Sequence, residues 1–209
     1  MKKISFNERY GLQQAVLDGT KTMTRRIVPE GTIRMAQMEV GIHGGNLADR
    51  IKDHSLYLWR DEVAIAQRYK DCWDYYQQLW EAKNDPSDWH TPDAILGDQV
   101  NETPGWKNKM FVRADLMPHR IRITNIRVER LQDISEEDCL KEGIHEYFPY
   151  IDRNPNDRVR TFQYFKDGKI RHRMSPAPEC FALLIDDLCG RGTWKRNPWV
   201  YVYKFELIK

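Results

Sequence analysis

Two segments of the chain alternate hydrophobic and polar residues with a period of two, a pattern that predicts β-strands. In residues 120–131, Ile121 and Ile123 flank Arg122, and the apolar phase then slips by one position at Asn125. A one-residue slip of this kind is typical of a β-bulge. In residues 198–208, four aromatic residues occupy alternate positions: Trp199, Tyr201, Tyr203 and Phe205. We therefore expect a long strand in each segment.

Shorter patterns predict the remaining elements. Further strands are expected over residues 3–6, 55–59 and 62–69, and a hairpin is expected over residues 161–174 with its turn at Asp167-Gly168. Capping residues followed by apolar positions at helical spacing predict helices over residues 7–18, 71–82 and 135–143, and from residue 175 onward. Pro29-Glu30-Gly31 is expected to be a turn, and prolines predict a surface loop over residues 84–105. Strands with short helices between them, and no regular βαβ alternation, favour a mixed, barrel-like α+β domain.

Composition restricts the class of protein. Hydrophobic residues make up 41% and charged residues 31% of the chain, which predicts a globular, soluble protein. No apolar run approaches the roughly 20 residues of a membrane helix, and the N-terminal residues lack the apolar core of a signal peptide. We therefore expect a cytoplasmic protein whose four cysteines, which have no CxxC spacing, stay reduced. The spacing of histidines and cysteines matches no metal motif, and no cofactor is expected.

The net charge of +2 is unevenly distributed along the chain. Residues 70–98 contain two lysines against seven acidic residues, whereas residues 152–173 contain seven basic residues against three aspartates. Residues 19–26 contain three basic residues and no acid. Such segregation is expected of a protein that captures an anion at one place.

The segment Gly-Thr-Lys-Thr-Met-Thr-Arg-Arg at residues 19–26 combines cations with hydroxyl groups. Lysine and arginine neutralise phosphate, and backbone amides near a turn can hold an anion. A partly buried lysine can also lose its proton, so Lys21 could act as a base toward the hydroxyl of Thr24. An ordinary solvent-exposed basic loop is the alternative interpretation.

Three further features each allow two interpretations. Glu142 ends its predicted helix, where a carboxylate opposes the helix dipole; it is either engaged with a buried cation or in acid–base chemistry, or simply exposed. Trp199 and the neighbouring Trp194 could stack on bases or belong to the core. The aromatic residues of the basic hairpin could likewise stack on single-stranded nucleic acid or face the core: Phe162, Tyr164 and Phe165.

Three segments, in their order along the chain, together resemble the ASCH domain family, in particular its larger phage- and prophage-encoded members. They are residues 19–28 (GTKTMTRRIV), 117–144 (MPHRIRITNIRVERLQDISEEDCLKEGI) and 192–205 (GTWKRNPWVYVYKF). The resemblance implies a PUA-like α+β fold, a mixed β pseudo-barrel with surrounding short helices and inserted loops. It would form a single domain over residues 1–209, with an acidic, aromatic-rich insertion near residues 70–105 and the basic hairpin near residues 158–174.

The resemblance also implies a function. The family is regarded as RNA-associated, and some of its small members hydrolyse N4-acetylcytidine to cytidine and acetate with a lysine base, a threonine nucleophile and a glutamate proton donor. The motif carries these three catalytic roles to Lys21, Thr24 and Glu142. Binding of RNA or a modified nucleoside would fall to a second set of residues: Thr22, Arg25, Arg26, Arg120 and Trp199.

Two departures separate this chain from the small enzymes of the family. The chain is larger than they are, and Gln67 stands where a glutamate is expected. The sequence therefore leaves three alternatives open. They are an amidohydrolase that removes an acyl group from a modified cytidine, a non-catalytic RNA-binding module and, third, a ribonuclease.

Overall fold

The computed structural model describes residues 1–85, 87–97, 100–147, 160–174 and 176–208. The chain folds into two compact units. Unit 1 comprises Met1–Phe6, Glu62–Arg122 and Leu207–Lys209, and unit 2 comprises Asn7–Asp61 and Ile123–Glu206. Both units contain helices and strands, so the α+β class expected from the sequence is confirmed. None of the helices in the described ranges has both the length and the apolar composition needed to cross a bilayer.

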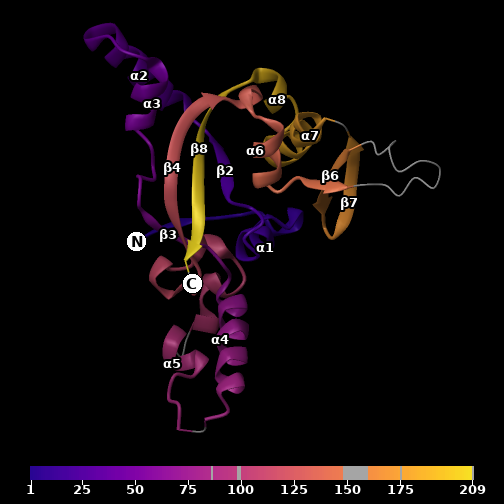
Figure 1. The fold of residues 1–209 in the computed structure, drawn as a ribbon. Helices are drawn as coiled ribbons and strands as arrows, with labels where there is room; N and C mark the ends of the chain where they lie inside the picture. The colour runs from indigo at the N-terminus through magenta and orange to yellow at the C-terminus, as the bar shows by residue number, and fades with distance from the viewer. Residues whose placement is uncertain (86, 98–99, 148–159, 175, 209) are drawn as a thin grey trace, which may run out of the picture. The chain divides into compact units, whose positions relative to one another are not determined.

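Unit 1 is built on two short strands and the first residues of a long one (Figure 1). β1 (Lys2–Ile4) runs parallel to β3 (Glu62–Ile65), with Lys2 opposite Val63. β3 in turn pairs antiparallel with the start of β4 (Arg120–Arg130), where Val63 lies opposite Ile121. β4 is therefore the strand that the alternating pattern predicted.

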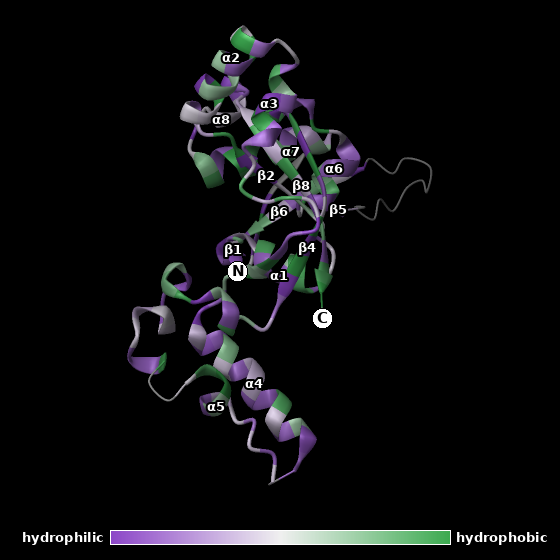
Figure 2. Ribbon diagram, turned by 90° about the vertical axis from the view of Figure 1, so that its left-hand side faces the viewer, coloured by the Kyte–Doolittle hydropathy of each residue, from purple (hydrophilic) through white to green (hydrophobic). Residues whose placement is uncertain are grey.

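Helices occupy the insertion near residues 70–105. α4 (Tyr69–Lys83) matches the predicted helix, and Figure 2 shows both hydrophobic and hydrophilic residues along it. The predicted surface loop is wrong in part, because Thr91 caps a short helix that begins at a proline, α5 (Pro92–Leu96). Four 3-10 helices follow: η2 (Val100–Glu102), η3 (Pro104–Trp106), η4 (Lys109–Phe111) and η5 (Ala114–Leu116). Together they enclose a core that consists of Ala64, Ala66, Tyr69, Cys72, Leu96, Val100, Val112 and Met117.

Unit 2 contains the rest of β4 together with β2 (Met23–Ile27) and β8 (Trp199–Ile208). β2 and β8 pair antiparallel, with Thr24 opposite Tyr203. Hydrogen bonding orders the strands of the larger sheet as β1-β3-β4-β8-β2, and within the described residues this mixed sheet does not close into a barrel. A second sheet contains β5 (His145–Tyr147), β6 (Thr161–Lys166) and β7 (Lys169–Met174) in that order.

β6 and β7 form the predicted hairpin. Asp167 and Gly168 adopt positive φ angles of 53° and 72°, as a tight two-residue turn of type I′ requires. Phe162 and Tyr164 are buried and Phe165 is half-buried, so the first two belong to the core and offer no face to a nucleic acid. Residues 158–159 of the predicted basic hairpin lie outside the described residues.

Short helices surround the strands of unit 2. η1 (Glu8–Tyr10) and α1 (Leu12–Leu17) follow Asn7, whose side chain accepts a hydrogen bond from the Arg9 N–H as the predicted cap. α6 (Glu136–Lys141) begins after Ser135, as predicted, and packs beside β2. α7 (Ala177–Cys189) packs against α6 and against α8 (Thr193–Arg196) (Figure 1). The 3-10 helix η6 (Leu131–Asp133) connects β4 to the segment that leads into α6.

Two predictions for residues 29–59 are wrong. Pro29 does not form a turn but precedes α2 (Glu30–His43), which is followed by α3 (Leu47–Asp53). Ala36 is the one fully buried residue of α2, and Ile33 and Val40, at helical spacing from it, are half-buried. Residues 55–58 bend irregularly instead of forming the predicted strand, and a turn at Trp59 and Arg60 follows, closed by a hydrogen bond from the Asp61 N–H to the Leu58 carbonyl.

Candidate active site

Lys21 is a buried cation at the junction of α1 and β2. Gly19 adopts a φ of 74° and ends α1, as its position in the sequence predicted. The Lys21 N–H then donates to the Ala15 carbonyl, and the Thr22 N–H donates to the Lys141 carbonyl at the end of α6. These two hydrogen bonds hold the segment between α1 and α6, and the Lys21 side chain is only 2% exposed.

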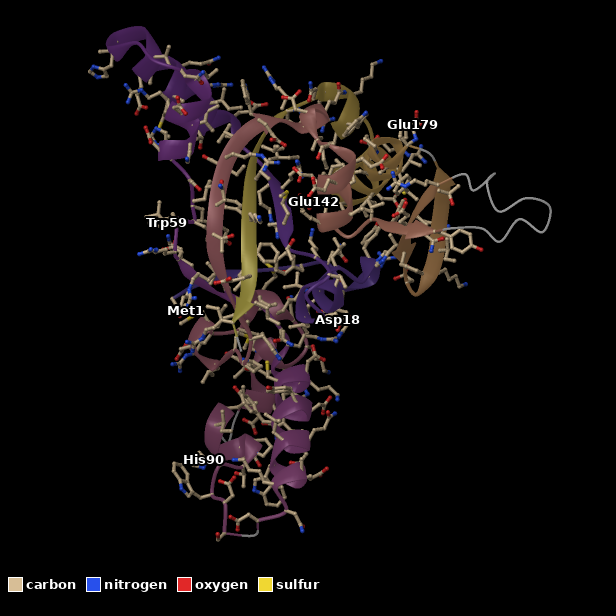
Figure 3. All side chains as sticks on the ribbon, viewed as in Figure 1. Met1, Asp18, Trp59, His90, Glu142 and Glu179 are labelled. Carbon is tan, nitrogen blue, oxygen red and sulfur yellow. The ribbon has the colours of Figure 1, made fainter. Side chains whose placement is uncertain are left out.

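Glu142 comes from the other side of this junction. Ser135 caps α6 through a hydrogen bond from the Asp138 N–H, and the helix ends at Glu142, which Gly143 follows with a φ of 100°. The Glu142 side chain lies near the strands and is 5% exposed (Figure 3). Its Oε2 accepts a hydrogen bond from Lys21 Nζ at 2.8 Å. A carboxylate that opposes the helix dipole is therefore matched by a buried cation.

Arg25 joins the same carboxylate from β2. Its Nη1 donates to Glu142 Oε1 at 3.0 Å, and its Nη2 donates to Glu129 at 2.6 Å and to Asp138 at 3.2 Å. The Arg25 guanidinium is 1% exposed and lies 5.9 Å from the centre of the Phe181 ring. Its Nε is buried and makes no hydrogen bond within the described residues.

Three cations and three carboxylates form the centre of one network: Lys21, Arg25, Arg127, Glu129, Asp138 and Glu142. At its margin Lys141 lies 3.8 Å from Asp138 and pairs with Glu137. Arg127 has the most exposed side chain of the six central residues, at 43%, so the network extends from the interior to the surface. Formal charges balance, which is the condition for burying so many ionic groups.

Burial lowers the pKa of Lys21, and the Glu142 carboxylate opposes this effect only in part. Burial would raise the pKa of Asp138, but hydrogen bonds from Arg127 and Arg25 bring it below its usual value. Lys21 is therefore held closer to losing its proton than a lysine in water, while Asp138 stays ionised.

The surroundings of Lys21 Nζ suit the neutral amine as well as the ammonium ion. Nζ lies 2.7 Å from the Met23 carbonyl, 2.7 Å from the Glu142 carbonyl and 2.8 Å from the Glu142 carboxylate. An ammonium ion donates to all three, whereas a neutral amine donates to the two carbonyls and accepts from a protonated carboxyl. A proton can therefore pass between Lys21 and Glu142 without leaving any of these groups unpaired.

Thr24 lies apart from this contact. Successive side chains of a strand point to opposite faces, so Thr24 and Arg25 project from opposite faces of β2. Across the ladder Thr24 faces Tyr203, whose hydroxyl is hydrogen-bonded to Ser55. Thr24 is buried, yet no hydrogen bond joins its hydroxyl to Lys21 or Glu142 in the part of the chain that the structure describes.

The other predicted binding residues are dispersed. Thr22 is half-buried before β2, and Arg26 is exposed on that strand. Trp199 is half-buried at the start of β8, and the Arg130 guanidinium stacks over its ring at 4.3 Å. Arg120 is half-buried in unit 1, whereas the Lys21 network belongs to unit 2. The structure thus brings Lys21, Arg25 and Glu142 together out of the predicted set.

Sequence reasoning missed three members of the network. They are Arg127, Glu129 and Asp138. The available signal was the strand period, which places Arg127 and Glu129 on one face of β4. The described residues contain no group of histidine, cysteine or acidic side chains that could hold a metal ion.

Comparison of the chain with models of protein families, with curated proteins and with solved structures finds no match.

Proposed function

We propose that this protein is an amidohydrolase that acts on an acylated nucleoside or base, with Lys21 and Glu142 as its proton-transferring pair. The observation that carries the proposal is their buried contact of 2.8 Å, made by residues 121 positions apart. A buried lysine whose pKa is lowered by burial, in direct contact with a carboxylate, is typical of acid–base catalysis.

The meeting of the three resembling segments supports the ASCH-like interpretation. Strand β2 lies in the segment of residues 19–28 and pairs with β8, which lies largely in the segment of residues 192–205. The third segment, residues 117–144, reaches β2 through the contacts of Glu142 with Lys21 and Arg25. A PUA-like pseudo-barrel is part of the same proposal, and the antiparallel β2–β8 pair beside α6 is what supports it.

In the proposed reaction, neutral Lys21 takes a proton from the nucleophile as it attacks the amide carbonyl carbon. A C–O bond forms, and the C–N bond breaks as protonated Glu142 donates a proton to the leaving amine. The pair then returns to its starting form when Lys21 passes its proton directly to Glu142. Arg25 Nε is a buried donor with no acceptor among the described residues, and it is suited to stabilise the developing oxyanion.

The nucleophile of this reaction has two candidates. The resemblance assigns it to Thr24, which would form an acyl-threonine that water hydrolyses. The alternative is a water molecule that attacks the amide directly. Thr24→Val removes the hydroxyl and keeps the branched shape, so it separates the two routes.

The test is release of cytidine from N4-acetylcytidine, followed by chromatography. We expect turnover by the unaltered protein and a loss of about 100-fold or more in Lys21→Met and in Glu142→Gln. Glu137→Gln is the matched control, because it makes the same chemical change on α6 at a side chain that is 78% exposed. Absence of turnover by the unaltered protein, or full turnover by folded Glu142→Gln, would refute the proposal for this substrate.

The non-catalytic RNA-binding module is the second candidate. In this hypothesis Lys21, Arg25 and Arg26 contact phosphate. Lys21 and Arg25 are buried against carboxylates, however, and Arg26 alone of the three is exposed. Binding of short single-stranded RNA that weakens steeply with salt, without turnover of any amide, would favour this candidate.

A further inference from the structure

A second pocket lies within unit 2, and none of its lining residues belongs to the Lys21 network. Its volume is about 380 Å³, within the range of pockets that hold small ligands. α3 supplies Lys52 and Asp53, the turn before β3 supplies Leu58 and Trp59, and β4 supplies Thr124, Asn125 and Ile126.

Trp59 is the most prominent group of this pocket. Its indole is 62% exposed and projects from the turn (Figure 3). The Arg60 guanidinium stacks on the indole, 4.1 Å from the ring centre. Exposing a large flat ring to water is unfavourable, and a ring kept in this position is available for stacking.

The turn that carries Trp59 is held in a defined conformation. Arg60 adopts a φ of 68°, a left-handed conformation that costs a non-glycine residue about 1 kcal/mol or more. The Arg60 N–H donates to the Ile123 carbonyl at 2.9 Å, and the Asp61 carboxylate accepts from the Leu58 N–H at 2.8 Å. These bonds fix the strained turn beside β4, so Trp59 is presented by a preorganised segment.

Polar groups line the pocket beside the indole. The buried Thr124 Oγ1 makes no hydrogen bond within the described residues. Asn125 is exposed and carries a donor and an acceptor on one planar amide, which can match the edge of a base. Lys52 is exposed at the rim, where it can pair with an anion, as can Arg60.

We propose that this pocket binds a nucleotide, with its base stacked on Trp59, its polar edge turned to Thr124 and Asn125, and its phosphate near Lys52 and Arg60. The nucleotide can be free or a unit of a single strand, and the chemistry recognised is the same. A purely apolar peptide fits less well, because it would leave the Thr124 hydroxyl and the Asn125 amide unpaired. The proposal uses no residue of the Lys21 network and stands or falls independently of the proposed amidohydrolase.

The test measures binding of the full chain by fluorescence anisotropy, with a labelled hexanucleotide of RNA as the probe and unlabelled 5′-nucleotides as competitors. Loss of one stacking interaction worth about 1–3 kcal/mol corresponds to a Kd about 5- to 150-fold higher, which we expect for Trp59→Ala. Trp89→Ala is the matched control, because Trp89 is 73% exposed but lies in unit 1. If 5′-nucleotides compete at a concentration similar to that of the nucleotide units of the oligomer, the pocket is a mononucleotide site. If only oligomers compete, the pocket binds a unit of a single strand.

Lys52→Ala tests the phosphate contact separately. Removing one contact to a single strand should reduce the slope of log Kd against log salt by about 0.7. Unchanged binding by Trp59→Ala, or equal loss in Trp89→Ala, would overturn the proposal. So would a Trp59-dependent site that takes up an apolar peptide and no nucleotide.

Discussion

Among the described residues, Glu142 carries the only carboxylate bonded to Lys21. Glu142→Gln is therefore the most informative perturbation of the network. Arg25 would keep Glu129 at 2.6 Å and Asp138 at 3.2 Å after the change. Lys21 would keep the carbonyls of Met23 and residue 142, and the glutamine amide could offer it a neutral oxygen in place of the carboxylate. Glu142→Gln therefore leaves a buried ammonium ion without a counter-charge.

The magnitude follows from the geometry. With an effective dielectric constant of about 20, a contact of 2.8 Å corresponds to a direct attraction of about 6 kcal/mol, part of which offsets desolvation. Breaking a buried pair on one side costs about 3–5 kcal/mol in the free energy of unfolding, and we expect this loss for Glu142→Gln. Lys21→Met should cost less, about 1.5–3 kcal/mol, because Glu142 keeps its hydrogen bond from Arg25 at 3.0 Å.

Urea unfolding of four proteins measures the effect: the unaltered chain, both single variants and the double variant. The double variant contains no unpaired lysine, so it should be less destabilised than the sum of the single changes by about 2–3 kcal/mol. Additive losses would refute the inference that the two side chains form one buried unit. A larger loss of stability in Lys21→Met than in Glu142→Gln would refute the inference that Glu142 keeps Arg25 as a partner while Lys21 has no second carboxylate.

The pH dependence gives an independent check. The Lys21 pKa is already lowered by burial, and removing Glu142 removes an influence that raises it. At a pH between the lowered folded pKa and the ordinary lysine value near 10.4, the unfolded chain binds the proton and the folded chain does not. Stability then rises with pH, so the deficit of Glu142→Gln should shrink as the pH approaches 10. A constant deficit would contradict the buried, protonated lysine.

Two further predictions concern the surroundings of the site. Gly143→Ala should destabilise the protein by about 2–3 kcal/mol in thermal unfolding, since the φ of Gly143 is 100° and a Cβ would lie 2.9 Å from Leu12. Gly19→Ala should cost about 1 kcal/mol, because Gly19 has a φ of 74° but a Cβ there would meet open space. Equal losses in the two variants would contradict this reasoning. A thiol reagent at pH 8 should modify exposed Cys189 first, because the other three thiols are buried. Burial also raises the pKa of Cys72 and Cys139 to about 12 and that of Cys180 to about 11. A fast phase of thiol modification that persists in Cys189→Ser would disprove this.

The elements that sequence patterns predicted well are those whose local chemistry agrees with their packing. The caps at Asn7 and Ser135, the turn at Asp167-Gly168 and the aromatic alternation of β8 all appear as expected. α2 was missed because Pro29-Glu30-Gly31 was interpreted as a turn, although Pro before a first helical turn is common and Ile33, Ala36 and Val40 lie at helical spacing. The irregular segment of residues 55–59 was mistaken for a strand because its hydrophobic residues resemble those of a half-buried strand, although Leu56, Leu58 and Trp59 are all exposed.

The Lys21–Glu142 site could be predicted in part, because one of its residues stands out in its local sequence. Glu142 drew attention because its charge opposes the helix dipole, and that local conflict is explained by a cation distant in the sequence. Arg127 and Glu129 showed no such conflict, because charged residues are ordinary on the exposed face of a strand. Their role depends on tertiary packing of α6 beside β2, which no local pattern reports.

The position of Thr24 shows what spacing alone leaves undetermined. A lysine and a threonine three residues apart share a face on a helix, but they lie on opposite faces of a strand. The sequence placed both in a loop, whereas the structure begins β2 at Met23, between them. Lys21 precedes the strand and reaches Glu142 with its long side chain, but the short side chain of Thr24 is fixed beside Tyr203 by the ladder. An acyl-threonine therefore requires β2 to detach locally from β8, and attack by water does not. The geometry thus favours the Lys21–Glu142 pair acting on water, and full turnover by Thr24→Val is the result expected from it.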